Sequence, residues 1–210
     1  MDLFANVSPT LSPWLILLGF FVYAAGHSIM ASKWFKQIAA FFMDKAFDRY
    51  YRLIFNAGGT ITLLPILALV ALLPDRHLYT IPFPWTLANF ALQGLGALVL
   101  LVSLMQTGAA EFLGISQVFA PKATSEPKLV VRGFYKYMRH PLYTASMLFL
   151  WATPYLTQNI LALNIGISLY FYIGTFFEER KLVQDFGEDY LKYQRETPRF
   201  IPDIQKLIQG

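Results

Sequence analysis

Side chains that can carry charge or exchange protons gather at the two ends of one apolar hairpin. Six of them lie before or at the start of its first helix: Arg132, Tyr135, Tyr137, Arg139, His140 and Tyr143. The other two, Glu178 and Glu179, lie at the end of its second helix. Because a hairpin brings its ends together, arginine and histidine face paired carboxylates at a membrane boundary, which suits a pocket for a charged ligand. The same residues could instead be membrane anchors, an interfacial aromatic belt and a structural salt bridge.

The composition restricts the chemistry open to such a pocket. The chain has 210 residues and no cysteine, which excludes a disulfide-stapled domain, a thiolate metal site and a cysteine nucleophile. Its three histidines are scattered without metal-binding spacing, so no metal site is predicted. The net charge of +4 comes without dense Lys/Arg runs, so we expect no nucleic-acid partner.

Long apolar runs indicate an all-α, polytopic membrane helical bundle within a lipid bilayer. Only 14% of the residues are charged, against about 25% in a typical soluble domain. About five transmembrane helices are expected, over residues 11–31, 53–73, 85–105, 142–155 and 160–177. The first run lacks the basic head of a cleaved signal peptide, so we expect it to be retained. The last two form a short C-terminal helical hairpin around Pro154.

The distribution of Lys and Arg predicts the orientation, because basic residues stay on the cytoplasmic side. They concentrate in residues 33–52, in residues 122–139 and in the tail, whereas Arg76 falls on the other side. We therefore expect the N-terminus outside and the C-terminus in the cytoplasm, in a bacterial-type inner membrane. Aromatic and basic residues at near-helical spacing predict an interfacial amphipathic helix near residues 33–46.

These elements predict a single membrane domain over residues 1–210. Three N-terminal spans occupy residues 1–106, a cytoplasmic loop follows over 107–140, and the hairpin covers 141–177. The remaining residues, 178–210, form a cytoplasmic tail. Its apolar residues are spaced for an amphipathic helix over 178–197 that packs back onto the cytoplasmic mouth of the bundle.

Three blocks in the C-terminal part of the chain follow one another in a specific order. Residues 133–143 read G-x-Y-x-x-x-R-H-P-x-Y, residues 178–193 read E-E-x-x-L-x-x-x-F-G-x-x-Y-x-x-Y, and residues 198–202 read P-R-x-I-P. This order resembles the isoprenylcysteine carboxyl methyltransferase family. The resemblance implies an integral membrane methyltransferase that uses S-adenosyl-L-methionine, held between the loop before the hairpin and the helix after it.

The resemblance also implies which residues hold this cofactor. They are Lys128, Leu129, Val130, Tyr135, Arg139, His140, Pro141, Leu142, Tyr143 and Glu178. Arginine or histidine can bind the cofactor carboxylate, Glu178 can accept hydrogen bonds from its amino and hydroxyl groups, and tyrosine faces suit its adenine and sulfonium. Glu179 would point about 100° away from Glu178 on a helix.

Methyl transfer from a sulfonium needs in-line approach and desolvation more than acid–base help, so no catalytic triad is expected. The candidate catalytic residues are His140 and Arg139, and His140 is the candidate base if the acceptor is a thiol. Candidates for binding the acceptor are Glu179 and His27, which lies near the inner end of the first span, where a packing role is the alternative.

One departure from the family concerns the methyl acceptor. In the prenylcysteine enzymes an arginine four residues before the cofactor glutamate engages the substrate carboxylate, and this chain has Gly174 there. We therefore expect a thiol or another small or lipophilic acceptor. His27-Ser28, residues 49–56 and residues 151–154 resemble the nurim-type branch, which includes bacterial membrane thiol S-methyltransferases.

Two other functions fit part of the same pattern. Membrane sterol reductases, which use NADPH, share R-H-P-x-Y followed by a tyrosine-rich tail, although the small size and paired glutamates of this chain favour the methyltransferase. A non-catalytic, nurim-like structural protein or accessory subunit, with a membrane complex as its partner, is the third interpretation.

Overall fold

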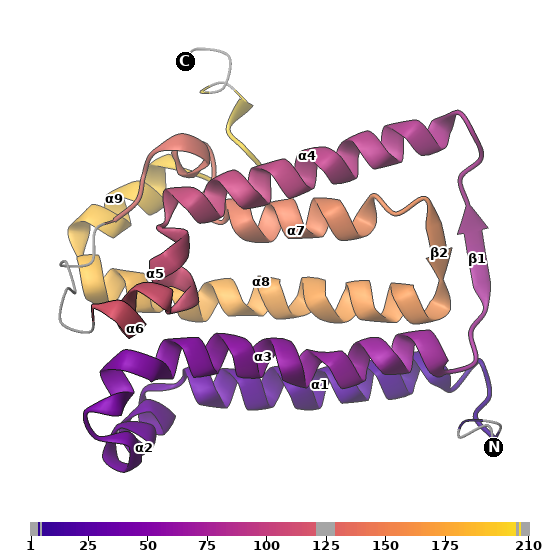
Figure 1. Cartoon of the computed structure of the whole chain (residues 1–210). Coiled ribbons are helices and arrows are strands. Elements are labelled where there is room, and N and C mark those ends of the chain that lie inside the picture. Colours follow the sequence, from indigo (N-terminus) through magenta and orange to yellow (C-terminus); the bar gives the residue numbers. More distant parts are fainter. Residues whose placement is uncertain (1–3, 5, 121–128, 205, 207–210) are drawn as a thin grey trace. The chain divides into compact units, whose positions relative to one another are not determined.

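A computed structural model describes residues 4, 6–120, 129–204 and 206 (Figure 1). The described part of the chain is mainly helical, as predicted. Its elements are α1 (Ser12–Ala31), α2 (Lys33–Met43), α3 (Ala46–Leu72), β1 (His77–Thr80), α4 (Trp85–Gln106), α5 (Ala109–Leu113), α6 (Ile115–Phe119), η1 (Gly133–Lys136, a 3-10 helix), α7 (Pro141–Trp151), β2 (Tyr155–Thr157), α8 (Gln158–Phe186) and α9 (Glu188–Glu196). The two short strands pair with each other.

Four of these helices, α1, α3, α4 and α8, are long and apolar enough to cross a membrane. The polytopic, all-α membrane architecture is therefore confirmed. The fourth predicted span, over residues 142–155, corresponds to α7, which has only 11 residues and is shorter than the helices at the other four predicted spans. At about 1.5 Å per residue, α7 reaches roughly half of the ~30 Å hydrocarbon core.

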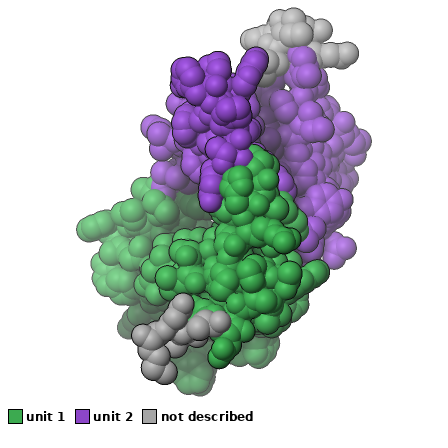
Figure 2. Space-filling view, turned by 90° about the vertical axis from the view of Figure 1, so that its right-hand side faces the viewer, with its two compact units in different colours: residues 1–79, 110–125, 156–167 green, residues 80–109, 126–155, 168–210 purple. Residues whose placement is uncertain are grey.

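The chain forms two compact units, each built from separated segments (Figure 2). Unit 1 comprises residues 1–79, 110–125 and 156–167, and unit 2 comprises residues 80–109, 126–155 and 168–210. In unit 1, α1 packs on α3 through a small residue: a Cβ on Gly19 would lie 3.1 Å from the Ile66 side chain. Bare backbone at such a position lets two apolar helices approach closely.

Unit 2 is built around the pair α4 and α7. A Cβ on Gly96 would lie 3.0 Å from the Ala145 carbonyl, so the two backbones are in near-direct contact. Polar side chains of α4 reinforce this contact, because Asn89 donates to the Ala152 carbonyl (3.1 Å) and Gln93 to the Phe149 carbonyl (3.2 Å). This packing holds the first turn of α7, which carries the R-H-P-x-Y block, beside the end of α4.

The boundary between the last two helices lies at a different residue from the one predicted. A separate tail helix was predicted to begin at Glu178, but α8 continues through it to Phe186. Residues 178–186 contain no proline or glycine, so nothing interrupts the helix until Gly187, whose φ is +56°. Glu178 and Glu179 therefore project from a continuous helix. The predicted interfacial helix is α2, which exposes Trp34, Phe41 and Phe42.

Candidate active site

The R-H-P-x-Y block is held in place by the C-terminal residues of the chain. The backbone amides of Arg139 and His140 donate to the carbonyls of Pro198 (2.9 Å) and Arg199 (3.0 Å). The Thr144 hydroxyl donates to the Phe200 carbonyl at 2.9 Å. The P-R-x-I-P block thus runs alongside the first turn of α7 and fixes the direction of its side chains.

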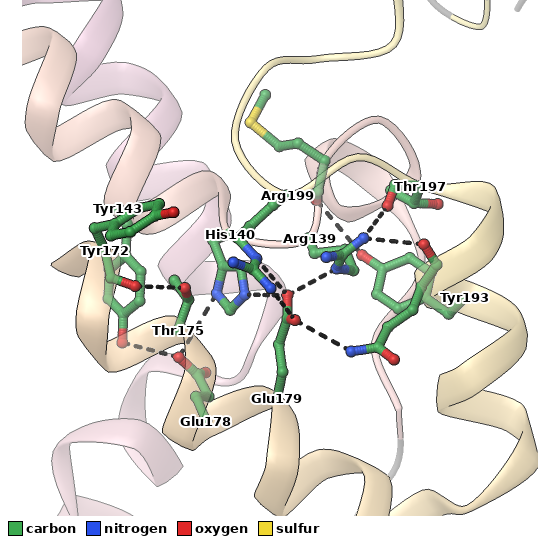
Figure 3. Close-up of polar contacts among 12 residues, drawn as sticks. Arg139, His140, Tyr143, Tyr172, Thr175, Glu178, Glu179, Tyr193, Thr197 and Arg199 are labelled. Carbon is green, nitrogen blue, oxygen red and sulfur yellow. Dashed lines mark hydrogen bonds and ion pairs between the residues drawn. The ribbon is translucent and has the colours of Figure 1, made fainter.

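Glu179 is the centre of a buried ionic cluster in unit 2 (Figure 3). Its Oε1 accepts from Arg139 Nε (2.9 Å), Arg199 Nε (3.2 Å) and His140 Nε2 (3.0 Å), and its Oε2 accepts from Arg199 Nη2 (2.8 Å) and Gln194 (3.1 Å). A buried carboxylate is stable only when its charge and lone pairs are matched in this way. The cluster ties α8 to the start of α7 and to the tail.

Arg139 belongs to the same cluster and is half-buried. Besides Glu179, its guanidinium donates to the carbonyls of Gln194 (3.0 Å) and Thr197. Three of its bonds therefore go to neighbouring protein atoms. Its position and partners are those of a group that holds α9 and the tail beside α8.

Glu178 has a different environment from Glu179, its neighbour in the chain. The Glu178 side chain is 45% exposed, against 6% for Glu179. Its Oε2 accepts a hydrogen bond from the Tyr143 hydroxyl (2.9 Å) and lies 3.6 Å from His140 Nδ1. Successive residues of a helix point about 100° apart, which sends one carboxylate into the cluster and leaves the other at an open edge.

The His140 ring lies between the two glutamates, with one ring nitrogen facing each of them (Figure 3). Because a carboxylate only accepts hydrogen bonds, Nε2 must be the donor to Glu179, and the neutral ring then keeps its lone pair on Nδ1. Tyr143 stacks on this ring at 5.4 Å with an interplanar angle of 1°, and Phe171 stacks on Tyr143 at 4.7 Å. The orientation of His140 is thus fixed by packing as well as by hydrogen bonds.

Tyr135 lies on η1, which α4 and α9 hold in position. The Phe134 amide donates to the Gln106 side chain at 3.2 Å, and the Tyr193 hydroxyl donates to the Tyr135 carbonyl at 2.6 Å. Burial raises the pKa of the Tyr135 and Tyr193 hydroxyls, so both stay protonated and neutral at physiological pH. Tyr135 therefore contributes a neutral phenol group near the Glu178 carboxylate.

The structure brings together most of the predicted site residues within unit 2. Arg139, His140, Tyr143, Glu178 and Glu179 form one connected network. The remaining predicted residues lie nearby in the sequence: Pro141 is buried at the start of α7, Leu142 follows it half-buried, and Leu129 and Val130 are half-buried before η1. Lys128 lies outside the described residues.

Three contributors to the network were not among the predicted site residues. Arg199 lies within the P-R-x-I-P block, so its motif was a usable signal. Gln194 and Gln106 carry no such signal, because an isolated glutamine in a helix is ordinary. Their roles depend on which backbone atoms the fold brings within reach.

His27 belongs to unit 1 and packs among aromatic rings. Its ring centroid lies 4.4 Å from that of Phe55 and 5.7 Å from that of Tyr23. A Cβ on Gly59 would lie 2.7 Å from the imidazole, so this glycine makes room for it. The role of His27 in acceptor binding stays a prediction.

Known proteins resemble this chain over most of its length. The family described as phospholipid methyltransferase matches residues 91–189. The methanethiol S-methyltransferase of Crocosphaera subtropica is 32% identical over 200 residues, covering 90% of this chain and 74% of the relative. The enzyme of the same name from Mycobacterium tuberculosis is 30% identical over 199 residues, covering 90% and 76%.

A more distant relative belongs to the family that the sequence motifs resemble. The protein-S-isoprenylcysteine O-methyltransferase of Schizosaccharomyces pombe is 34% identical over 96 residues, covering 42% of this chain and 39% of the relative. No solved structure matches the chain. The membrane-crossing helices and these relatives define an integral membrane methyltransferase. The chain belongs to the family of the methanethiol S-methyltransferases, which confirms the predicted resemblance and enzyme class.

Proposed function

We propose that this methyltransferase uses S-adenosyl-L-methionine as donor and methylates the sulfur of a small or lipophilic thiol. Two relatives named methanethiol S-methyltransferase, similar over nine-tenths of the chain, support the thiol acceptor. Gly174 also supports it, because this helix position carries no side chain that could bind a carboxylate, and open space surrounds the point where a Cβ would lie.

The observation that carries the proposal is the contrast between the two glutamates. Glu179 is buried and engaged by several donors, so its charge serves the fold. Glu178 is a half-exposed carboxylate beside two stacked rings, His140 and Tyr143. An anionic acceptor next to aromatic faces suits a ligand that has amino and hydroxyl donors, a cationic sulfur and a flat base.

The residues around Glu178 therefore fit the cofactor. Glu178 would accept its amino or ribose hydroxyl hydrogens, while Tyr143 and Tyr135 would contact its cationic and aromatic parts. When bound, the cofactor supplies an electrophilic methyl group. The first turn of α7 and the end of α8 would exclude water from one side of this group, which favours attack by sulfur over hydrolysis.

We assign to His140 the removal of the thiol proton. Its Nε2–H is held by Glu179, so its Nδ1 lone pair points toward Glu178 and can accept a proton there. The imidazolium that results is stabilised by the carboxylates on either side. Glu179 and Arg139 are positioning residues in this proposal, since they orient His140 and the tail.

The orientation predicted from the basic residues completes the proposal. With the C-terminus in the cytoplasm, the polar cofactor would reach Glu178 from the aqueous side, and a lipophilic thiol would arrive from the bilayer. The orientation also places α2 on the cytoplasmic surface.

Calorimetry on the detergent-purified full chain tests the proposal. We expect micromolar binding of S-adenosylmethionine and S-adenosylhomocysteine, no binding of NADPH, and loss of binding in Glu178→Ala. Asp185→Ala, an exposed acidic residue on the same helix, is the matched control and should bind normally. Binding of NADPH alone would instead assign the chain to the reductases, and binding of neither would indicate an accessory subunit.

A second assay tests the acceptor. Purified enzyme with S-adenosylmethionine and methanethiol should form dimethyl sulfide, and His140→Ala should slow this reaction most at low pH, where little thiolate forms spontaneously. An unimpaired rate of His140→Ala at low pH would contradict the assigned base. Methylation of carboxylates but not of thiols would contradict the proposed acceptor.

A further inference from the structure

A pocket lies in unit 1, formed by the end of α1, the first turn of α2, the second and third turns of α3, and α5. Its volume is about 250 Å³. It is lined by Ala31, Lys36, Tyr51, Arg52, Phe55, Asn56 and Phe112. Pockets that enclose a whole drug-sized ligand occupy about 300–1,000 Å³. This pocket therefore suits one part of a larger molecule, or a small one.

The charge of the pocket is positive. Lys36 and Arg52 contribute basic groups, and none of the described residues that line it is acidic. Arg52 donates one hydrogen bond to the backbone carbonyl of Glu111 at 2.8 Å. This bond anchors the guanidinium, but a neutral carbonyl does not balance its positive charge. The pocket therefore favours an anion.

The shape of the pocket is fixed by bonds between α3 and its neighbours. Asn56 donates to the Phe112 carbonyl at 2.9 Å, and the Tyr51 hydroxyl donates to the Met30 carbonyl. A Cβ on Gly114 would lie 2.5 Å from the Leu53 amide nitrogen, so the chain after α5 packs directly on α3. These contacts hold the part of α3 that carries Arg52 and Phe55 in one arrangement with α1 and α5 before any ligand binds.

The pocket opens beside a helix with the character of an interfacial element. Within α2 the side chains of Trp34, Phe41 and Phe42 are 64%, 81% and 79% exposed, although all three are large and apolar. Such a helix lies at the level of the lipid headgroups with its apolar face toward the acyl chains. A basic pocket at that level meets phospholipid phosphates.

We propose that this pocket binds the headgroup of an anionic phospholipid. Lys36 and Arg52 contact the phosphate, while the acyl chains leave the pocket along its phenylalanine rings into the bilayer. Basic pockets between membrane helices on the cytoplasmic side bind anionic headgroups in this way. The function of such a site is to fix α2 and the start of α3 against the membrane surface.

Lipid-dependent stability of the detergent-purified full chain tests this site. The midpoint of thermal unfolding is followed while short-chain phosphatidylglycerol, short-chain phosphatidylcholine or inorganic phosphate is added. We expect phosphatidylglycerol alone to raise the midpoint, because a ligand of the folded state stabilises it by mass action. An equal rise with inorganic phosphate, or no rise with phosphatidylglycerol, would overturn the proposal.

Three variants locate the effect in the pocket. Lys36→Gln should weaken the apparent affinity for phosphatidylglycerol about fivefold, the size expected for one basic residue near an anionic surface. Ala31→Leu, which fills the pocket from an exposed position without changing charge, should abolish the response. Lys45→Gln removes an exposed charge from the start of α3 and should behave as the unmodified chain. An equal loss in Lys45→Gln would show that diffuse surface charge attracts the lipid.

Discussion

Two adjacent glutamates near the end of α8 differ in burial and in partners, and the proposed function gives them separate roles. Around Glu179, two guanidinium groups and the His140 ring donate to the carboxylate oxygens, and the guanidinium groups are those of Arg139 and Arg199. Around Glu178, a half-exposed carboxylate meets only part of its hydrogen-bonding capacity with Tyr143. The buried cluster gives rigidity, and the exposed carboxylate keeps accepting capacity for a ligand. Substitutions at the two positions should therefore have opposite profiles.

The largest effect is expected from Glu179→Gln. The neutral side chain keeps the size of glutamate but leaves Arg139 and Arg199, whose side chains are 10% and 25% exposed, without a counter-charge. Removing one partner of a buried ion pair costs about 3–5 kcal/mol. Unfolding of the purified variant in detergent, followed by circular dichroism against temperature, should show a strongly lowered midpoint. An unchanged midpoint would mean that the cluster does not hold the C-terminal part of the chain together.

Glu178→Gln should give the reverse result. Its half-exposed position predicts a change in unfolding free energy within about 0.5 kcal/mol, typical of surface substitutions. A charged hydrogen bond contributes about 1.5–3 kcal/mol, so affinity for S-adenosylhomocysteine should fall roughly tenfold to a hundredfold. Calorimetry and thermal unfolding on the same preparation measure both quantities. A variant that unfolds early yet binds normally would reverse the two assigned roles.

The next effect concerns the segment that carries Tyr135. Gly133 has a φ of +61°, and a Cβ there would lie 2.0 Å from the Gln106 amide nitrogen. Gly133→Ala should displace Gln106 from the Phe134 amide, shift η1 and raise KM for the methyl donor more than it lowers kcat. Backbone strain adds about 1–3 kcal/mol of destabilisation.

Gly187→Ala is the control for Gly133→Ala. Gly187 also has a positive φ, of +56°, but nothing lies within 4 Å of the position that its Cβ would take. It therefore shares the backbone strain and lacks the clash. If both variants raise KM equally, the contact with Gln106 has no part in positioning η1.

The sequence predicted the membrane-crossing helices better than the end of α8. Apolar runs gave the four long helices, because length and hydropathy alone decide which segments can cross a bilayer. The end of α8 was predicted nine residues too early, at residue 177, because the change to polar residues was taken as a boundary, whereas the helix continues to Phe186. The different directions of Glu178 and Glu179 followed from helix geometry.

Other parts of the site depend on contacts that no local pattern encodes. Arg199 reaches Glu179 only because the C-terminal residues run back along the first turn of α7. Gln106 caps η1 from the end of a different helix, at a separation of 28 residues. The Gln106 bond follows from the packing of α4 on α7 and the Arg199 bonds follow from the path of the tail, and a single sequence reveals neither.

The smallest effect concerns alkaline pH and the contact between α9 and η1. Tyr193→Phe removes the hydrogen bond to the Tyr135 carbonyl and should cost about 1 kcal/mol at neutral pH. Burial raises the pKa of the Tyr193 hydroxyl above its ordinary value of 10.0. Above pH 10 the unfolded chain therefore loses this proton while the folded chain keeps it, so stability is full below pH 10 and falls as the pH rises. Tyr193→Phe should lose less stability than the unmodified chain between pH 9 and 11 in urea unfolding, and equal slopes would place the titration elsewhere.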